Sequence, residues 1–434
     1  MVLPMIDTNG TLRHRAFFDV LATTDEASDA WRSARAGLVT LRLLDAWIEA
    51  GDGQASLASI RAREKAFKYE VDAVQSVIAE LPTKGAERRL LSSIVARIVA
   101  AHDGEPPRLV APLFAYARAL HIRSAWGLAA DVYAIVWDSY VGDDGIGPVD
   151  GDVATAVALY LGICYRTIGD AERAVRAFHV SGTLAKSRGD ERGILRARLG
   201  ETKLYASRGD LPLAHEQLID IIAAASGANC GDVRAFAWHD LAHVALQRGH
   251  FEEGIGYGYE ALVSTVDPIE RERVLVTLSS LLLLAGHPDV ARDANSLLAE
   301  IGHEPFTRWA ATINLIEIAT IERRELDFMR HRRALVGAGL PPTLAAECEY
   351  YVGQGHLAFG QPMLAAAAFD RAVTIAERHE LAEILQRVTT ARDAVRAGHA
   401  LAPPRRATAG PRPIGVSRVA DAIHSARLLA AVGG

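Results

Sequence analysis

The segment HDLAH, from His239 to His243, holds the residues with the clearest capacity for chemistry. Two histidines four residues apart lie on one face of a helix and can hold a zinc ion, and an acid beside the first can activate a metal-bound water. Such a site also needs a third ligand, an open coordination position and a base of sufficient reach. The acid here is Asp240, one methylene shorter than the glutamate that this chemistry uses. The interpretation therefore depends on the elements that carry and surround these residues.

Composition indicates a folded protein without nucleic-acid or membrane character. The chain has 434 residues, 50% of them hydrophobic, which is enough for two or three compact domains or one elongated repeat array. Its 47 Lys and Arg residues against 53 Asp and Glu residues give a net charge of −6 without long runs of either sign, so nucleic acid is not an expected partner. The three cysteines are far apart in the sequence, which fits a reducing compartment. The sequence shows no basic leader and no long apolar segment, so we expect a cytoplasmic protein that is not attached to a membrane.

Glycines divide the chain at regular intervals. Glycine followed by a polar residue recurs with spacings of 40, 40, 37 and 74 residues, the last being about two units. Glycine supplies the left-handed conformation that ends a helix, and small residues seven before and five after it let two helices approach closely. The pattern predicts an all-α chain of helical hairpins. The glycines are Gly169, Gly209, Gly249, Gly286 and Gly360.

Two segments, LYLGICYRTIGDAERAVRAF (159–178) and EYYVGQGHLAFGQPMLAAAAFDRA (349–372), make the pattern specific. They resemble the tetratricopeptide repeat (TPR) family, in the longer-repeat form of bacterial regulatory proteins. The resemblance covers about residues 150–380 and implies a right-handed α-solenoid of hairpins. One unit departs from it, because the turn glycine is missing near Arg324 and Glu317 stands where the small residue belongs. We expect a distorted hairpin there.

Four regions are expected along the chain. Residues 1–102 form an N-terminal helical region, either a bundle or divergent repeats, and residues 103–400 form the TPR-like superhelical array. A Pro-rich linker follows at 401–417, and an amphipathic helix at 418–434. That helix either docks on its own chain or a neighbouring molecule, allowing self-association, or remains a mobile tail. Its apolar stripe is Val419, Ala422, Ile423, Ala426, Leu429 and Val432.

The family resemblance places the two histidines on a binding surface. In TPR proteins the first helix of each hairpin lines the concave face, and the inward positions lie thirteen, ten, six, three and two residues before the turn. His239 and His243 occupy two such positions. The resemblance thus implies a peptide-binding groove lined by Arg166, Arg196, Lys203, Phe236, His239, His243, Gln247, Arg273, Asn314, Tyr350 and Gln354.

The basic residues of this set argue against a metal. Lys203 and Arg273 would repel a cation, so we expect no metal and no cofactor. Two readings of the histidines remain open. They either pack and hydrogen-bond within the groove, or they join Arg196, Lys203 and Arg273 in contacting an acidic peptide.

The sequence favours a protein that is not an enzyme. Phosphate loops and nucleophile elbows are absent from it. The expected function is a scaffold or adaptor that binds an acidic or amphipathic segment of a protein or peptide in the groove. A second hypothesis is a ligand-responsive regulator resembling bacterial peptide-pheromone receptors, although residues 1–101 show no DNA-binding motif. A metal-dependent hydrolase at HDLAH is the remote third.

Overall fold

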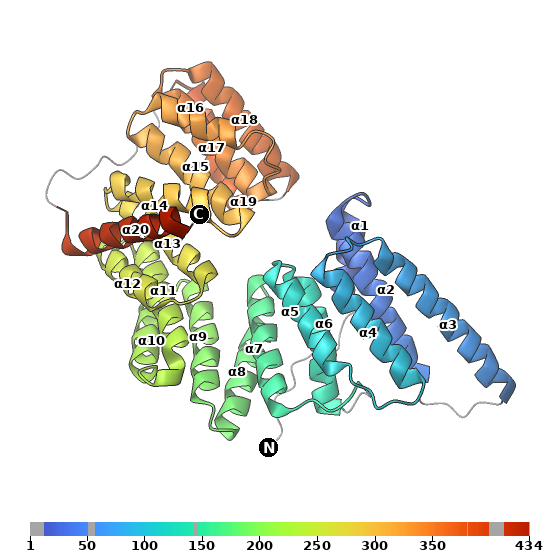
Figure 1. The fold of residues 1–434 in the computed structure, drawn as a ribbon. Coiled ribbons are helices and arrows are strands. Elements are labelled where there is room, and N and C mark those ends of the chain that lie inside the picture. Colours follow the sequence, from blue (N-terminus) through green and yellow to red (C-terminus); the bar gives the residue numbers. More distant parts are fainter. Residues whose placement is uncertain (1–12, 51–56, 143–145, 380, 399–411, 434) are drawn as a thin grey trace. The chain divides into compact units, whose positions relative to one another are not determined.

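The computed structural model describes residues 13–50, 57–142, 146–379, 381–398 and 412–433 (Figure 1). Throughout these ranges the regular structure is helical, with one short 3-10 helix, η1, at Ala228–Cys230. The expected all-α array of hairpins is confirmed. The chain forms two compact units, 1–209 and 210–434. None of the described helices is long and apolar enough to cross a membrane.

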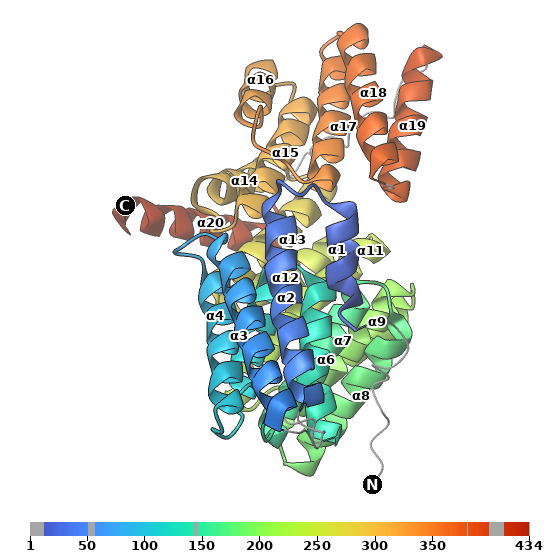
Figure 2. The ribbon, with the colours of Figure 1, turned by 90° about the vertical axis from the view of Figure 1, so that its right-hand side faces the viewer.

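The first unit joins a helical bundle to repeat hairpins. Helices α2, α3 and α4 pack side by side, α1 lies against α2 and α6, and α4 leads into α5 (Figure 2). Helices α5 and α6 form one hairpin and α7 and α8 the next, around one continuous core. The bounds are α1 Arg15–Thr23, α2 Asp29–Ala50, α3 Leu57–Ala79, α4 Ala86–His102, α5 Val110–Ile122, α6 Trp126–Gly142, α7 Gly151–Thr167, α8 Ala171–Ser187 and α9 Glu191–Ser207.

The second unit is a succession of hairpins. The pairs are α11 with α12, α13 with α14, α15 with α16 and α17 with α18. The first helices α11, α13, α15, α17 and then α19 contact one another in turn, and we call them the first-helix layer. The bounds are α10 Leu211–Ala224, α11 Gly231–Arg248, α12 Phe251–Ser264, α13 Pro268–Leu284, α14 Pro288–Ile301, α15 Pro305–Ile321, α16 Glu325–Ala334, α17 Pro342–Ala358, α18 Pro362–Arg378, α19 Ala382–Arg396 and α20 Ile414–Gly433.

Gly-Asp pairs show how the sequence sets the hairpin turns. Gly169 ends α7 with a left-handed φ of 87°, which costs a glycine little. The side chain of Asp170 then accepts a hydrogen bond from the Arg173 amide at 3.0 Å and caps α8. The turn residue and the cap thus stop one helix and start the next within three residues.

In the distorted unit a non-glycine residue makes the turn. Arg323 adopts a φ of 59° and lies 37 residues after Gly286 and 37 before Gly360. Ile316 therefore takes the position seven before the turn, and Glu317 the position six before it. The expectation that Glu317 fills the small-residue position is wrong by one residue, because it took the turn to lie at Arg324. Helix α16 is also short, with 10 residues, and α17 packs directly on α15.

The C-terminal helix α20 docks on its own chain. It packs against the second helices α12 and α14, where Val416, Val419 and Ile423 are buried. Arg427 pairs with Asp293 at 3.8 Å, and Arg412 pairs with Asp289. The described part of the helix thus makes its extensive contacts with second helices. The side chains of Leu429 and Val432, two members of the expected stripe, lie outside the described residues.

Candidate functional site

The two histidines of HDLAH share one hydroxyl group. The Nε2 atoms of His239 and His243 lie 2.9 Å and 3.2 Å from Oγ1 of Thr277, a buried residue of α13. A hydroxyl can donate to one imidazole and accept from the other. The contact engages one ring nitrogen of each histidine, and it links α11 to α13. Within the described ranges, no group of three or more His, Cys, Asp or Glu side chains is arranged to hold a metal ion.

Arg273, the basic residue expected beside the histidines, has a partner on its own helix. Its Nη1 lies 2.5 Å from Oε1 of Glu270, one turn earlier in α13. An ion pair of this kind reduces the positive charge offered to a ligand. On the same layer Phe236 is half-buried and Gln247 exposed.

The remaining expected residues of the second unit are in two different settings. On α17, Nε2 of Gln354 donates to the Tyr350 hydroxyl at 2.9 Å. Arg387 of α19 stacks over the Tyr350 ring at 4.7 Å. Asn314 of α15 instead donates to Oδ1 of Asn295 at 3.2 Å. Asn295 belongs to α14, so Asn314 is engaged with a second helix.

Glu317 lies near Tyr350 and Arg387. The sequence analysis did not place it on the binding surface, because it assigned the turn to Arg324 instead of Arg323. Burial raises the pKa of Glu317 to about 7, against the charge of Arg387 and a hydrogen bond with Tyr351. Glu347 adds to the rise, and its Oε1 lies 3.6 Å from Nη2 of Arg387. Carboxylates from α15 and α17 thus meet one arginine from α19 on the first-helix layer.

The other expected basic residues belong to the first unit. Arg196 and Lys203 are half-buried and lie seven residues apart on α9, about two helical turns, so they share a face. Arg166 is half-buried on α7, whose neighbour in the first-helix order is α9.

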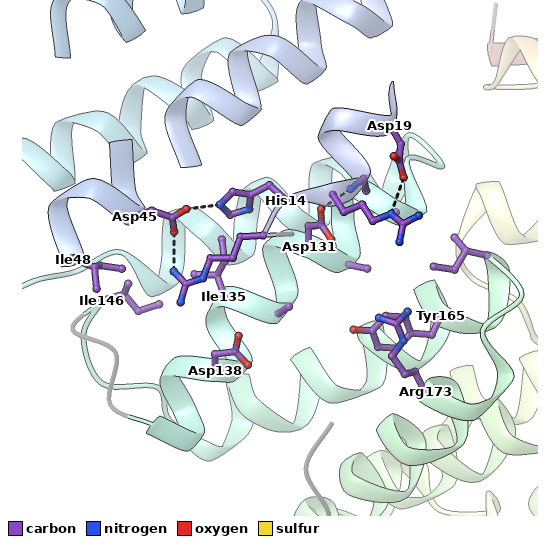
Figure 3. A pocket seen from close by; sticks show the side chains of 17 residues that line it. His14, Asp19, Asp45, Ile48, Asp131, Ile135, Asp138, Ile146, Tyr165 and Arg173 are labelled. Atoms are coloured by element: carbon purple, nitrogen blue, oxygen red, sulfur yellow. Dashed lines mark hydrogen bonds and ion pairs between the residues drawn. The ribbon is translucent and has the colours of Figure 1, made fainter. Parts of the chain in front are cut away.

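The first unit also contains a pocket that no sequence motif predicted. It has a volume of about 350 Å³ and lies where α1 and α2 meet α6 (Figure 3). One face of α6 supplies much of its wall, with Gly127, Asp131, Ile135 and Asp138 at intervals of three or four residues. Tyr165 of α7 closes another side. Because the lining comes from segments far apart in the chain, local spacing gave no signal for it.

A histidine and an aspartate hold one end of this pocket. His14 is buried and left-handed, with a φ of 60°, and its Nε2 lies 2.9 Å from Oδ2 of Asp45. Nη1 of Arg13 donates to the other oxygen of Asp45 at 3.1 Å. Burial alone would raise the pKa of Asp45, but His14 and Arg13 together hold it below its ordinary value.

Asp131 has a different environment in the same pocket. Its Oδ2 accepts a hydrogen bond at 3.0 Å from the amide of Ala16, in the first turn of α1, where a carboxylate is favourable. Burial nevertheless raises the pKa of Asp131 to about 6. Burial also raises the pKa of Tyr165 to about 12, opposed by Arg173 and reinforced by the charges of Asp131 and Asp138.

Comparisons with known proteins found similar solved structures and no related sequence. Protein-family models and curated sequences give no match to this chain. Among solved structures, a Rap protein complexed with competence and sporulation factor is similar at 12% identity, covering 83% of this chain and 98% of that chain, with a TM-score of 0.44. The apo quorum sensor NprR from B. thuringiensis is similar at 11% identity, covering 84% and 87%, with a TM-score of 0.39.

A further similar structure is a signal transduction ATPase with numerous domains from Pyrococcus horikoshii, which has a TPR sensor. Its identity is 11%, its coverage 89% of this chain and 69% of that chain, and its TM-score 0.46. In our chain, two-helix hairpins, left-handed turn residues and a layer of mutually contacting first helices repeat in order. The chain has the TPR fold.

Within this TPR fold, two adjacent positions of each first helix behave differently. On α7, α9, α11, α13, α15 and α17, the residue seven before the turn is buried, whereas the residue six before it is half-buried or exposed. The buried residues are Gly162, Thr202, Ala242, Ser279, Ile316 and Gly353, and the accessible residues are Ile163, Lys203, His243, Ser280, Glu317 and Gln354.

Proposed function

We propose that this chain is a non-catalytic TPR protein that binds a segment of a partner protein or peptide on its first helices. The position six before each turn is the observation that carries the proposal. On these six helices it is half-buried or exposed, and it holds a different residue each time: Ile, Lys, His, Ser, Glu and Gln. Packing between the helices does not explain this variety, since the buried residue one position earlier makes the contact between them.

Side chains of varied type that remain partly accessible on successive first helices suit recognition of another chain. Binding energy in such interfaces concentrates in a few aromatic and arginine side chains, with polar positions adding specificity. The second unit offers Tyr350 and Arg387 in contact, beside the polar Gln354. The first helices therefore present anchors as well as a pattern that differs from hairpin to hairpin.

We further propose that the bound segment is acidic or amphipathic. Arg196 and Lys203 support an acidic part, because both lie on one face of α9. Arg273 supports it less, since Glu270 balances its charge within α13. In the second unit, Phe236 and Tyr350 would contact apolar side chains of a bound segment.

Affinity capture with the full chain tests the binding surface. The test variant changes Lys203, His243 and Gln354 to alanine, all at the accessible position. A matched control changes Lys186, Glu377 and Arg378, which are exposed on the second helices α8 and α18. We expect the first variant to lose the captured partner and the control to retain it, with similar helical content in both. Equal capture by the two variants would place binding elsewhere.

Charge reversal tests the nature of the segment. The double variant Arg196→Glu, Lys203→Glu should capture less partner than the wild-type protein at low salt. Capture by the wild-type protein should itself decrease as the salt concentration rises. Capture that is insensitive to both changes would exclude an acidic segment while leaving the binding surface in place.

A further inference from the structure

Helix α20 connects the second helices of two successive hairpins. It packs on α12 of the hairpin α11/α12 and on α14 of the hairpin α13/α14 (Figure 1). Val416, Val419 and Ile423 are buried in the same hydrophobic cluster as residues of α12 and α14. The two hairpins also meet where α12 packs on α13. The C-terminal helix therefore adds a direct link between two second helices.

Polar and ring contacts of α20 reach both hairpins. On the α12 side, the guanidinium carbon of Arg418 lies 5.8 Å from the centre of the Tyr259 ring, within the range of a cation–π contact. On the α14 side, Nη1 of Arg427 lies 3.8 Å from Oδ1 of Asp293. The helix is thus oriented by specific contacts with each of the two hairpins.

The same two hairpins are joined a second time on the first-helix layer. Nε2 of His239 and Nε2 of His243, both on α11, lie 2.9 Å and 3.2 Å from Oγ1 of Thr277 on α13. This junction is therefore linked in both layers, by a docked helix on the second helices and by three polar side chains on the first helices.

The two links are mechanically related. In an array of helical repeats, the rotation between neighbouring units sets the curvature of the binding surface. Because α12 packs on α13, a rotation about that contact that separates α12 from α14 must also change the spacing between α11 and α13. A helix that fixes the second helices therefore also fixes the spacing of the first helices.

The contacts of α20 are few enough for it to leave without unfolding the hairpins. Its fully buried side chains are three aliphatic ones, and the half-buried residues beside them are small: Ala420, Ala422 and Ala426. The side chains of Arg427 and Asp293 are 42% and 52% exposed, and an exposed ion pair contributes little to stability. Docking of α20 is thus an equilibrium that a modest free energy can shift.

We propose that α20 is a regulatory clamp on the binding surface. Docked on α12 and α14, it holds α11 and α13 at one spacing; undocked, it lets the two hairpins rotate. The inference rests on the proposed function, because Phe236, His239 and His243 belong to the first-helix surface. The docked state is the one that binds the partner segment, since a surface held in one arrangement loses less entropy on binding. By linkage, a bound segment strengthens the docking of α20.

Two double variants of the full-length protein separate the docked from the undocked state. Val419→Asp with Ile423→Asp places two charges on the buried face of α20 and should undock it. His424→Asp with Ser425→Asp places two aspartates on its exposed face and is the matched control. Amide hydrogen exchange at residues 414–428 should become fast in the buried-face variant and stay slow in the control.

Spin labels on the two first helices measure their spacing in each variant. Arg234→Cys and Arg271→Cys place the labels at equivalent exposed positions of α11 and α13, fifteen residues before the turn glycines. The three cysteines of the chain itself are buried. The distribution of distances between the labels should become about twice as wide in the buried-face variant and stay unchanged in the control. An unchanged distribution after α20 has undocked, or fast exchange of α20 in the wild-type protein, would overturn the proposal.

Affinity capture separates the clamp from the proposed function. Recovery of the partner that the wild-type protein captures should fall about fivefold with the buried-face variant and stay constant with the control. Equal recovery by the two variants would exclude the regulatory role of α20. If the wild-type protein captures no partner, the proposed function fails, and the label distances still decide whether α20 fixes the spacing of α11 and α13.

Discussion

The hairpins α17/α18 and α15/α16 fill the space between their two helices with different side chains. In α17/α18, Gly353 faces the ring of Phe369, and a Cβ at this glycine would lie 2.7 Å from the ring. In α15/α16 the equivalent of the glycine is Ile316, and Phe328 of α16 instead packs on Gly355 of α17. Phe328 lies five residues after its turn, whereas Phe369 lies nine after its own, and Phe328 makes its close contact with the next hairpin.

Hairpin α7/α8 repeats the arrangement of α17/α18. Gly162 pairs with Phe178, where a Cβ would lie 2.6 Å from the ring. In α13/α14 the same two positions hold Ser279 and Asn295, and Ser279 donates to Asn295 at 3.4 Å. In α7/α8 and α17/α18, the phenylalanine nine residues after the turn thus fills the space that the glycine seven before the turn leaves open.

The largest effect is expected from breaking the regular hairpin. Gly353→Leu forces a side chain into the ring of Phe369, which is fully buried, and should cost about 1–3 kcal/mol through overpacking. Adding Phe369→Ala should recover part of that loss, because it frees the space that leucine needs. Thermal melting of the two single variants and the double variant measures the coupling. Purely additive losses would show that the two positions do not compensate.

An intermediate effect is expected from making the irregular hairpin more like the regular one. Glu317→Gln places on α15 the residue that α17 carries at the same position. The folded-state pKa of Glu317 is raised from 4.5 to about 7, so its contribution is fully present below pH 4.5 and is lost as pH rises through 7. The glutamine variant should therefore gain about 2 kcal/mol over wild type at pH 8.5 and little at pH 5. Denaturant titrations at both pH values test this, and a gain independent of pH would contradict it.

The smallest effect compares the two turns. Gly360 has a φ of 76°, so Gly360→Ala should cost about 1 kcal/mol for the left-handed strain. Arg323 already bears that strain at 59°, and Arg323→Ala should lose only its exposed hydrogen bond to the Ala358 carbonyl. Melting temperatures should fall more for the glycine variant. Equal falls would mean that the arginine hydrogen bond offsets the whole strain.

The fold was predictable because its signals are local. A left-handed glycine marks the hairpin turns at five places, and at Gly169 and Gly209 a capping aspartate follows directly. The predicted position of one turn was wrong by one residue, because that turn lacks the local signal. Arg323 adopts the turn conformation without being glycine, and no local signal marks that choice.

The sites were less predictable because they depend on contacts between distant segments. Helical spacing placed His239 and His243 on one face, but the Thr277 hydroxyl that both contact comes from another helix. The pair of Arg273 with Glu270 is only three residues apart and could have been found from spacing. The contact of His14 with Asp45 brings together residues 31 positions apart, and that of Ala16 with Asp131 spans 115.

The docking of α20 on α12 and α14 changes how the end of the chain can unfold. In an array of nearest-neighbour contacts, terminal hairpins fray first because nothing holds their far end. Here the 112 residues between Ile301 and Ile414 are anchored at both ends. If α15 to α19 open while α20 stays bound, they form a closed loop, which has about 4 kcal/mol less conformational entropy than a free end of that length. The second unit should consequently lose its last hairpins together with α20 in one cooperative step rather than one helix at a time.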